Sequence, residues 1–333
     1  MQYHTDFSLK NYNTFGIDVM AKKFISVTTV QQLKTVLQEN NDVFLLGGGS
    51  NMLLTQNIDA TVVHLNLNGV IVNNQTENTV EVTASAGENW HEFVLWCIDQ
   101  NYGGLENLSL IPGNVGTCPI QNIGAYGFEV KDTITSLEAL NKKTLKIETF
   151  TNAECEFGYR NSIFKNKAKD QYAIISVTFK LTTKNHNTNT SYGAIQEELK
   201  NISNPSLKDI SNAVIAIRNS KLPNPKEIGN SGSFFKNPVI DITLFNKLKN
   251  QYPEIPSYPV SETLVKVPAG WLIEKAGFKG KRFGAAGVHS KQALVLVNYG
   301  DATGKEVYEI AKKIQRKIKT EFEIPLEIEV NVF

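Results

Sequence analysis

Two periodicities of apolar residues run through this chain, and together they predict a protein of mixed helices and strands. Alternation of apolar and polar residues, or a short continuous apolar run, indicates a strand. The longest alternation lies near the middle of the chain, where Ile175, Val177, Phe179 and Leu181 would share one face. Strands are predicted at residues 24–27, 43–46, 62–65, 80–84, 134–140, 144–150 and 172–182.

Helix signals separate several of these strands. Apolar side chains at 90–98 recur with the helical period of about 3.6 residues. Ser206 with Asp209, and Thr303 with Glu306, have the form of a capping box, which pairs main-chain N–H groups that a helix start leaves unpaired. Helices are therefore predicted from about residue 30 after Thr28 or Thr29, from 206 to about 218, over 269–276 and over 307–318.

The order of these elements predicts three regions. An α/β unit spans about the first 70 residues, an α+β region ends near Thr183, and the last third is again α/β. The long stretch 221–238 has neither period, but Phe234 and Phe235 argue against disorder, so a functional loop is expected. The chain closes in an alternating strand at 326–332, with Glu329 on the polar face.

Composition and charge narrow the class of protein. The chain has 333 residues and a formal net charge of +1, from 34 basic and 33 acidic residues. Proteins that bind nucleic acid usually carry a basic excess, so nucleic acid is not an expected partner. The cysteines Cys97, Cys118 and Cys155 form no CxxC pair, which favours a reducing compartment. No apolar run matches a membrane span and the first residues do not resemble a signal peptide, so we expect a cytoplasmic protein.

A glycine run follows the buried strand predicted at 43–46. Gly47, Gly48 and Gly49 can turn the backbone toward a ligand, and Ser50 and Asn51 add side-chain donors. The run lacks the last glycine of a dinucleotide fingerprint and the Gly-Lys-Ser/Thr of a Walker loop. A tight turn at a sheet edge explains it equally well.

A second glycine-rich stretch lies at 111–127. It uses glycine and proline together with Gln121, Asn122 and Tyr126, where an ordinary loop needs few such residues. Two loops of this kind suggest a large phosphorylated cofactor that is held from two sides.

Few residues offer chemistry of their own. The five histidines have no metal-ligand spacing, and there is no Gly-x-Ser-x-Gly motif, so a metal site and a serine triad are not expected. A reaction that side chains alone cannot carry out would then depend on a bound organic cofactor. Arg160, Ser233 and Glu329 remain as candidates, although an ion-pair arginine, a turn serine and a solvated carboxylate are ordinary alternatives.

These motifs resemble the UDP-N-acetylenolpyruvoylglucosamine reductases, a family of bacterial flavoenzymes of cell-wall precursor synthesis. The resemblance covers nearly the whole chain and rests on residues 47–51, 111–127, 159–162, 229–238, 269–273 and 326–330. Tyr192 resembles the feature of a subtype with a tyrosine loop over the substrate. The implied fold is α+β, an FAD-binding fold of the vanillyl-alcohol-oxidase (PCMH) type in two subdomains plus a C-terminal α/β substrate-binding domain.

The resemblance also implies domain boundaries and a cofactor site. Residues 1–70 and 71–218 would form the two FAD-binding subdomains, residues 219–323 the substrate-binding domain, and a strand at 324–333 would return to the site. FAD would contact Gly47, Gly48, Gly49, Ser50, Asn51, Ile111, Pro112, Gly113, Gly116, Ile120, Asn122, Ile123, Gly124 and Arg218.

The implied reaction is reduction of UDP-N-acetylglucosamine enolpyruvate to UDP-N-acetylmuramate, with NADPH as co-substrate. A hydride from reduced FAD would reach C3, and Ser233 would give a proton to C2, assisted by Lys221 or a water because serine is a poor acid. Arg160 and Glu329 would stabilise the enolate-like intermediate. The substrate would be held by Tyr126, Tyr192, Lys221, Asn237, Tyr258 and Gln292.

By the same resemblance the protein would be a monomeric oxidoreductase of peptidoglycan synthesis, and so serve cell shape and division. Its partners would be the nucleotide sugar and NADPH, with no membrane. The sequence departs from the family at Asn331, where an arginine is usual, and in its short tail, which puts one contact near the cofactor in doubt. Two alternatives stay open: another flavin oxidoreductase of this fold, and a non-catalytic protein that binds a nucleotide sugar.

Overall fold

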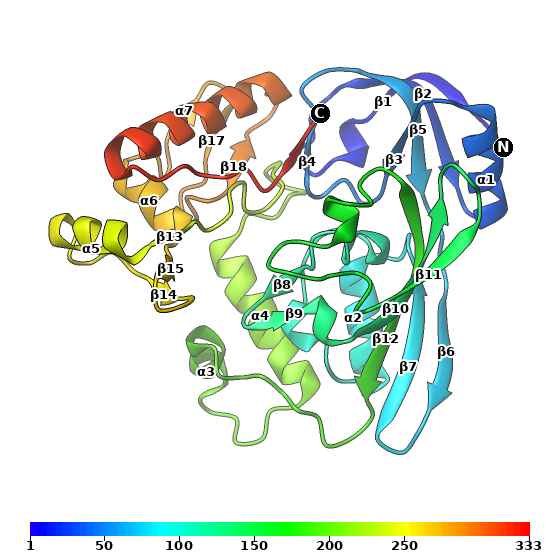
Figure 1. Ribbon diagram of the computed structural model, residues 1–333, viewed down its shortest axis with the longest axis horizontal. Coiled ribbons are helices and arrows are strands. Elements are labelled where there is room, and N and C mark those ends of the chain that lie inside the picture. Colours follow the sequence, from blue (N-terminus) through cyan, green and yellow to red (C-terminus); the bar gives the residue numbers. More distant parts are fainter. The chain divides into compact units, whose positions relative to one another are not determined.

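The computed structural model describes residues 1–333 and divides into two compact units, each with its own sheets and helices (Figure 1). Unit 1 consists of Met1–Phe7, Ala21–Gly48 and Asp59–Ser220, and unit 2 of Ser8–Met20, Gly49–Ile58 and Lys221–Phe333. Two short N-terminal segments therefore belong with the last third of the chain. The division of the chain at residues 70 and 218 into two subdomains and a substrate domain stays a prediction.

Unit 1 contains two main sheets. The four-stranded sheet has the order β1-β2-β5-β3, and the antiparallel five-stranded sheet has the order β11-β10-β12-β7-β6. The strands are β1 (His4–Ser8), β2 (Met20–Val27), β3 (Val43–Leu46), β5 (Ile58–Leu65), β6 (Val70–Gln75), β7 (Thr79–Ser85), β10 (Ile134–Asn141), β11 (Ile147–Thr151) and β12 (Tyr172–Thr182), with a small hairpin of β8 (Gly124–Ala125) and β9 (Phe128–Glu129). The helices are α1 (Val30–Glu39), α2 (Trp90–Asp99), α3 (Gly193–Leu199) and α4 (Leu207–Lys221), and short 3₁₀ turns are η2 (Glu106–Leu108), η3 (Val115–Thr117), η4 (Val130–Asp132) and η5 (Ile163–Lys165).

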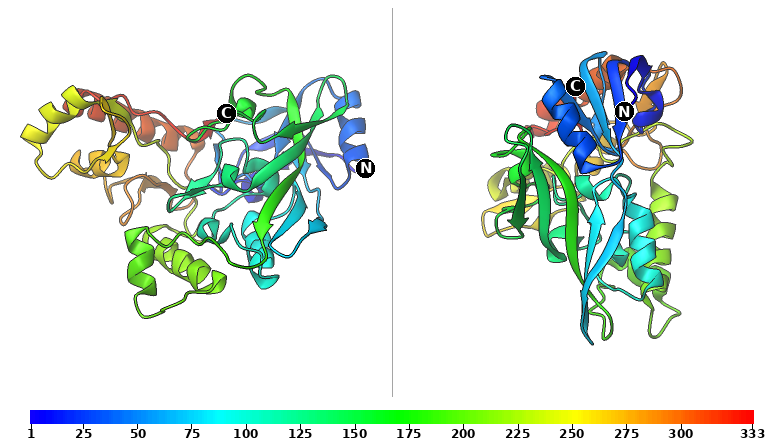
Figure 2. Two further views of the ribbon diagram at one scale, coloured as in Figure 1. Left: turned by 60° about the horizontal axis from the view of Figure 1, so that its bottom comes forward. Right: turned by 90° about the vertical axis from the view of Figure 1, so that its right-hand side faces the viewer.

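Helices α2 and α4 lie on the same side of the five-stranded sheet (Figure 2, right). The predicted apolar face of α2 is confirmed, because Trp90, Phe93 and Val94 are buried in the core against that sheet. The ring centroids of Phe93 and Phe179 of β12 lie 5.2 Å apart. Burial of each such side chain contributes about 1.5–3 kcal/mol, so this contact helps to hold α2 on the sheet.

The prediction that one face of β12 carries four residues was wrong for Ile175. Val177, Phe179 and Leu181 pack in the core under α2, but Ile175 packs in a second core with residues of α1, β2 and β5. In the β10–β12 ladder, Glu138 pairs with Ser176 and Ala139 pairs with Ile174, so Ile175 is an extra, unpaired residue. A bulge of this kind bends and twists its strand. Strand β12 can therefore contribute side chains to two hydrophobic cores.

Unit 2 contains three small sheets, with the orders β13-β15-β14, β16-β17-β18 and the parallel pair β19-β4. The strands are β4 (Met52–Leu53), β13 (Val239–Asp241), β14 (Tyr258–Pro259), β15 (Leu264–Lys266), β16 (Arg282–Phe283), β17 (Ala286–Val288), β18 (Leu296–Asn298) and β19 (Asn331–Val332). The helices are α5 (Ile242–Gln251), α6 (Ala269–Lys275) and α7 (Gly304–Phe322), with a 3₁₀ turn η1 (Lys10–Tyr12). Helix α7 packs on β17, β18 and α6 (Figure 1).

The predicted helix caps are confirmed, but the ends of some elements differ. Thr303 and Glu306 form the capping box of α7, Ser206 and Asp209 pair in the same way before α4, and Thr29 caps α1. The closing strand is regular only over β19, because residues 327–328 pair with the chain through isolated contacts rather than a continuous ladder. The pattern also missed short elements such as β6, α3 and α5, whose apolar faces are narrow. None of the helices combines the length and the apolarity that crossing a bilayer requires.

Candidate functional site

The first glycine run ends β3 and lies against the second glycine-rich stretch. A Cβ atom on Gly48 would come within 2.4 Å of the Asn114 Oδ1 atom, and one on Gly47 within 2.8 Å of the Thr117 Cγ2 atom. Both residues must therefore be glycine for the two loops to approach this closely. The predicted cofactor residues Gly47 and Gly48 are in this way brought together with the 113–117 turn inside unit 1.

The run continues into unit 2 at Gly49. Gly49 has a φ of +60°, and a Cβ atom there would lie 2.0 Å from the carbonyl oxygen of Tyr12. The carbonyl of Gly49 accepts a hydrogen bond from the N–H of Thr14 at 3.0 Å. The Asn51 carbonyl accepts hydrogen bonds from both the main-chain N–H (3.2 Å) and the side-chain amide (3.0 Å) of Asn331. Asn331 therefore ties the last strand to this loop, although an arginine is usual at this position in the family that the sequence resembles.

The second glycine-rich stretch is fixed onto the end of β7. The N–H of Val115 donates to the carbonyl of Glu88 at 2.9 Å, and the Asn114 side chain donates to the carbonyl of Gly87 at 2.8 Å. A Cβ atom on Gly116 would lie 2.4 Å from that of Ala86, so this glycine permits the close approach. Among the other predicted cofactor residues, Ile111, Ile120 and Ile123 pack against the core under α2, Pro112 is exposed, and Gly113 has a φ of +118°.

Arg218 of α4 lies in a cluster with Tyr126 and the loop before residue 111. The Arg218 Nε atom donates to the carbonyl of Leu110 at 3.2 Å, and the N–H of Leu110 donates to the His91 Nδ1 atom at 3.0 Å. Burial lowers the pKa of Arg218, while a hydrogen bond with Tyr126 opposes that shift. Burial raises the pKa of Tyr126, and the Tyr126 ring packs edge-on against Tyr192 with centroids 5.3 Å apart.

This cluster allows a test of whether unit 1 suits a phosphorylated cofactor. The groups around the partly buried Arg218 guanidinium are a carbonyl, a phenol and an imidazole, and none is a carboxylate. A partly buried guanidinium without a neighbouring carboxylate, next to a closely packed glycine-rich loop, suits an anionic ligand. The residues present therefore fit a phosphate-bearing group such as FAD. The structure gathers no group of three or more His, Cys, Asp or Glu residues that could hold a metal ion.

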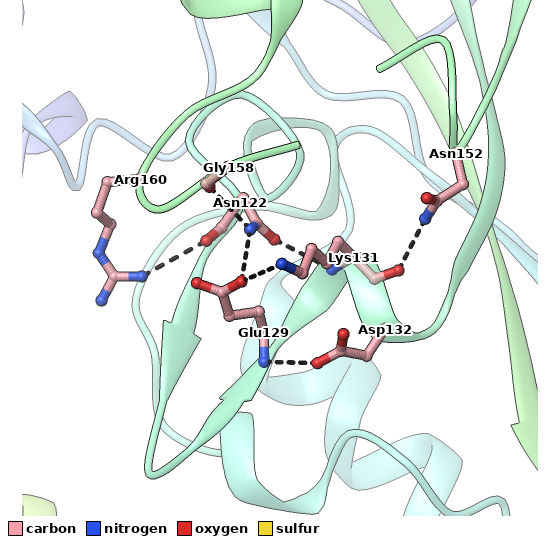
Figure 3. Close-up of polar contacts among 7 residues, drawn as sticks. All are labelled: Asn122, Glu129, Lys131, Asp132, Asn152, Gly158 and Arg160. Atoms are coloured by element: carbon pink, nitrogen blue, oxygen red, sulfur yellow. Dashed lines mark hydrogen bonds and ion pairs between the residues drawn. The ribbon is translucent and has the colours of Figure 1, made fainter. Parts of the chain in front are cut away.

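Arg160 is held on a tight turn beside Asn122 and β8. Its guanidinium donates to the carbonyl of Gly124 at 2.7 Å. It also donates to the carbonyl of Asn122 at 3.4 Å (Figure 3). The turn is closed by reciprocal main-chain hydrogen bonds between Gly158 and Asn161. Arg160 has a φ of +52°, a region that a long side chain seldom occupies. The predicted residues Arg160, Asn122 and Gly124 are thus neighbours, although they lie far apart in the sequence.

Ser233 and Glu329 are brought together within unit 2 by main-chain pairing. Ser233 bridges to Val295, and the N–H of Glu329 donates to the carbonyl of Phe234 at 2.9 Å. Phe235 bridges to Ile328, and Lys236 forms an ion pair with Glu327. The loop with Ser233 therefore lies between the segments 294–295 and 327–329.

The predicted substrate residues of unit 2 fall into two groups. The Asn237 Oδ1 atom accepts the N–H of Ala269 at 2.9 Å, and the Gln292 Oε1 atom accepts the N–H of Leu294 at 3.3 Å, next to the segment that pairs with Ser233. Tyr258 lies exposed in β14, and Lys221 ends α4.

The sequence did not indicate how the two N-terminal segments of unit 2 support the loop that carries Ser233. The carbonyl of Thr14 accepts the N–H of Asn230 at 2.9 Å, and the Ser231 hydroxyl donates to the carbonyl of Met52 at 3.0 Å. The carbonyl of Phe15 accepts the Asn298 side chain at 2.9 Å. The sequence Asn-Thr-Phe-Gly at residues 13–16 is typical of a turn, and a turn signal does not say what the turn will contact.

The chain is similar along its whole length to known proteins named UDP-N-acetylenolpyruvoylglucosamine reductase. The protein of this name from Flavobacterium johnsoniae is 61% identical over 336 residues, covering 100% of both chains. That from Pseudomonas putida is 46% identical over 339 residues, covering 100% of this chain and 99% of the relative. Residues 224–333 match the family model for the C-terminal domain of UDP-N-acetylenolpyruvoylglucosamine reductase, and residues 21–148 match that of an FAD binding domain.

Solved structures confirm the fold class. The structure titled UDP-N-acetylenolpyruvylglucosamine reductase from Thermus caldophilus aligns with a TM-score of 0.68 at 24% identity, covering 100% of this chain and 98% of that one. That of p-cresol methylhydroxylase aligns with a TM-score of 0.51 at 12% identity, covering 97% and 84%. At these identities the likeness concerns the fold alone, which is the α+β FAD-binding fold of the vanillyl-alcohol-oxidase type. The full-length relatives decide the family, and the chain belongs to the UDP-N-acetylenolpyruvoylglucosamine reductases.

Proposed function

We propose that this protein reduces UDP-N-acetylglucosamine enolpyruvate to UDP-N-acetylmuramate, with FAD as redox group and NADPH as reductant. The observation that carries the proposal is the 61% identity, over 100% of both chains, to a relative named for reduction of this substrate. The match of residues 21–148 to an FAD binding domain supports the cofactor. The reaction places the protein in peptidoglycan precursor synthesis, and we propose that it acts in the cytoplasm as a monomer.

The residues that would hold FAD are the glycine run 47–51, the stretch 111–124 and Arg218. The close packing of Gly48 on Asn114, and the Arg218 guanidinium without a carboxylate partner, support this assignment. Bound FAD would accept a hydride from NADPH and later supply one to C3 of the enolpyruvyl group.

Arg160 and Glu329 would stabilise the negative charge that develops on the substrate when its C3 atom gains a hydride. The Arg160 guanidinium is fixed by two main-chain carbonyls, so its orientation is set before the substrate binds. A charge-stabilising group that is already oriented needs no reorganisation during the reaction. Glu329 would complete the arrangement from the segment paired with Phe234.

Ser233 would donate a proton to C2 of the substrate. A serine hydroxyl is a weak acid, so it must be held in place and assisted, either by Lys221 or by a water. The main-chain contacts of Ser233 and Phe234 with Val295, Leu294 and Glu329 support the first requirement, because they fix the backbone that carries the hydroxyl.

The nucleotide sugar would be held by Tyr126, Tyr192, Lys221, Asn237, Tyr258 and Gln292. We further propose that the chain belongs to the subtype with a tyrosine loop. The edge-on contact between Tyr192 and Tyr126 supports this, because it places the tyrosine of the 184–192 segment beside the Arg218 cluster.

The visible absorption spectrum of the purified protein tests the proposal. We expect a flavin spectrum that bleaches with NADPH under anaerobic conditions and returns when the enolpyruvyl nucleotide sugar is added. A flavin that returns only with oxygen would contradict the substrate and favour another oxidoreductase of this fold. A protein that stays colourless with added FAD would contradict the enzyme and leave a nucleotide-sugar binding protein.

A further inference from the structure

Asn122 makes more hydrogen bonds than a loop residue needs, and all of them stay inside unit 1. The residue is fully buried and has a φ of +45°. Its Nδ2 atom donates to the Glu129 Oε2 atom at 3.1 Å and to the carbonyl of Gly158 at 3.0 Å. Its Oδ1 atom accepts the N–H of Lys131 at 3.1 Å (Figure 3). Because an amide group has only two N–H donors, the side chain has none left for a cofactor or substrate.

These contacts hold Arg160 from two directions. The Asn122 side chain holds the carbonyl of Gly158, two residues before Arg160, and the Asn122 carbonyl accepts the Arg160 guanidinium at 3.4 Å. Arg160 itself has a φ of +52°, which is unfavourable for its long side chain. An unfavourable backbone conformation persists only where the surroundings enforce it, and here the buried Asn122 contacts both the carbonyl of Gly158 and the guanidinium of Arg160.

A second layer of charged groups orients Asn122. The Glu129 carboxylate, which accepts from Asn122, forms an ion pair with the Lys131 ammonium at 2.8 Å. The N–H of Glu129 donates to the Asp132 carboxylate at 3.1 Å, which closes a capping box around η4. The Glu129 carboxylate can only accept a hydrogen bond, so the Asn122 side chain must turn its NH₂ group, and not its oxygen, toward Glu129. The network therefore sets the orientation of the amide.

We propose that Asn122 is a positioning residue that sets the place and orientation of Arg160, so that the guanidinium meets the substrate's developing charge. The role differs from the expected contact of Asn122 with FAD, because both N–H donors of its side chain are already used inside unit 1. The proposal rests on the catalytic role of Arg160 given above. Its structural part, that the Asn122 amide enforces the 158–161 turn, stands independently of that role.

The chain offers a matched control in Asn152. The Asn152 side chain donates to the carbonyl of Lys131 at 2.7 Å (Figure 3). It also donates to the carbonyl of Ile134 at 2.8 Å. Asn122 accepts the N–H of Lys131, and Asn152 donates to the carbonyl of the same residue, but Asn152 makes no hydrogen bond to the turn that carries Arg160. Replacing either asparagine removes two donors, and only one replacement removes support from Arg160.

Hydrogen–deuterium exchange on the full-length protein tests the structural part without substrate. Asn122→Gly removes the side chain but keeps a residue that tolerates positive φ. The amides of Gly158 and Asn161 donate to each other's carbonyls at 3.0 and 3.1 Å, so they report the turn directly. We expect about tenfold faster exchange of these amides in Asn122→Gly, as for loss of a hydrogen bond to a buried carbonyl, and wild-type exchange in Asn152→Ala. Equal effects in the two variants would overturn the proposal.

Rates of the two half-reactions test the catalytic part. In Asn122→Gly with FAD bound, we expect reoxidation of the flavin by the nucleotide sugar to slow about 100-fold, as for an approximately 1 Å displacement of a catalytic group. Reoxidation by the nucleotide sugar should slow more than reduction by NADPH does, because Arg160 faces the negative charge that develops on the sugar substrate. If Arg160→Ala slows reoxidation but Asn122→Gly does not, the proposal is overturned while the function stands. If the sugar does not reoxidise even the wild type, the function is wrong, and the exchange experiment still decides whether Asn122 holds the turn.

A conservative variant covers the case in which Asn122→Gly does not fold. Asn122→Asp keeps the Oδ1 acceptor for the N–H of Lys131 but places an oxygen, in place of the amide donor, opposite Glu129 and the carbonyl of Gly158. We expect the same pattern of faster exchange and slower reoxidation. Wild-type exchange at Gly158 and Asn161 in this variant would overturn the proposal.

Discussion

The turn that carries Arg160 and the loop that carries Ser233 are held in place by different kinds of contact. In unit 1, buried side chains hold the Arg160 turn: Asn122 binds Gly158, and the Ser162 hydroxyl donates to the carbonyl of Ile120 at 2.7 Å. In unit 2, main-chain groups pair Ser233 and Phe234 with the 294–295 and 327–329 segments. The first arrangement depends on which side chains are present, and the second depends on how closely backbones can approach.

This difference predicts where each part of the protein is vulnerable. A side-chain network weakens when one donor is removed, because a partly buried carbonyl then loses one of its hydrogen bonds. A backbone arrangement tolerates many side-chain changes but fails where a Cβ atom meets a main-chain atom. Four predictions, from the largest expected effect to the smallest, test this contrast.

The chemistry of the Ser233 loop should depend on the hydroxyl of one serine only. We expect Ser233→Ala to slow flavin reoxidation by the nucleotide sugar about 10²- to 10⁴-fold, as for loss of a general acid, and to leave reduction by NADPH within about twofold. Stopped-flow absorbance of the flavin measures both rates. Ser231→Ala is the control, because the Ser231 hydroxyl donates to the carbonyl of Met52 and should affect stability instead. An equal loss of both half-reactions in Ser233→Ala would contradict the proton-donor role.

Replacing a glycine with alanine should destabilise the protein much more in the Ser233 region than in the Arg160 turn. A Cβ atom on Gly229, just before the Ser233 loop, would lie 2.1 Å from the carbonyl oxygen of Phe15, whereas one on Gly158 in the Arg160 turn would find its nearest atom at 3.6 Å. We expect Gly229→Ala to lower the free energy of unfolding by about 3 kcal/mol and Gly158→Ala to change it by less than about 1 kcal/mol. Urea denaturation measures both, and similar losses would contradict the contrast.

The helix caps should matter equally in the two units, because both caps use the same chemistry. Asp209 donates its N–H to the Ser206 hydroxyl at 3.2 Å before α4, and Glu306 donates to the Thr303 hydroxyl at 3.2 Å before α7. Replacing either hydroxyl residue with alanine should lower the free energy of unfolding by about 1 kcal/mol. Hydrogen exchange should show each loss in the helix that follows the cap. A loss confined to one variant would mean that its cap is redundant with tertiary packing.

The smallest expected effect is a dependence of unit 1 on pH. The pKa of His91 lies below its ordinary value of 6.5, through burial and then through repulsion from Arg218. The unfolded chain therefore binds more protons below about pH 6.5, and stability is lost as the pH falls through this range. His91→Asn keeps an acceptor for the N–H of Leu110 but does not titrate. We expect this variant to lose less stability than wild type between about pH 7.5 and 5.5, and an equal loss would assign the effect to other groups.

Much of the candidate site was predicted from the sequence as separate motifs. The capping box before α7 and the apolar face of α2 are local patterns, and each was confirmed. The assignment of the glycine runs to a cofactor stays a prediction. What each motif contacts could not be predicted in the same way. Ile175 reads as one of four residues on a face, and only its pairing with β10 makes it the extra residue of a bulge.

The sequence by itself determined the family, the fold class and the chemistry available, because these are carried by residue types at fixed short spacing. The tertiary structure alone decided that Thr14 and Met52 support the Ser233 loop, and that Asn122 turns its amide to Gly158 and Glu129. The physical reason is the range of the interactions. Capping and periodicity act within one or two turns of chain, whereas these contacts join residues far apart through single hydrogen bonds, which leave no local period to detect.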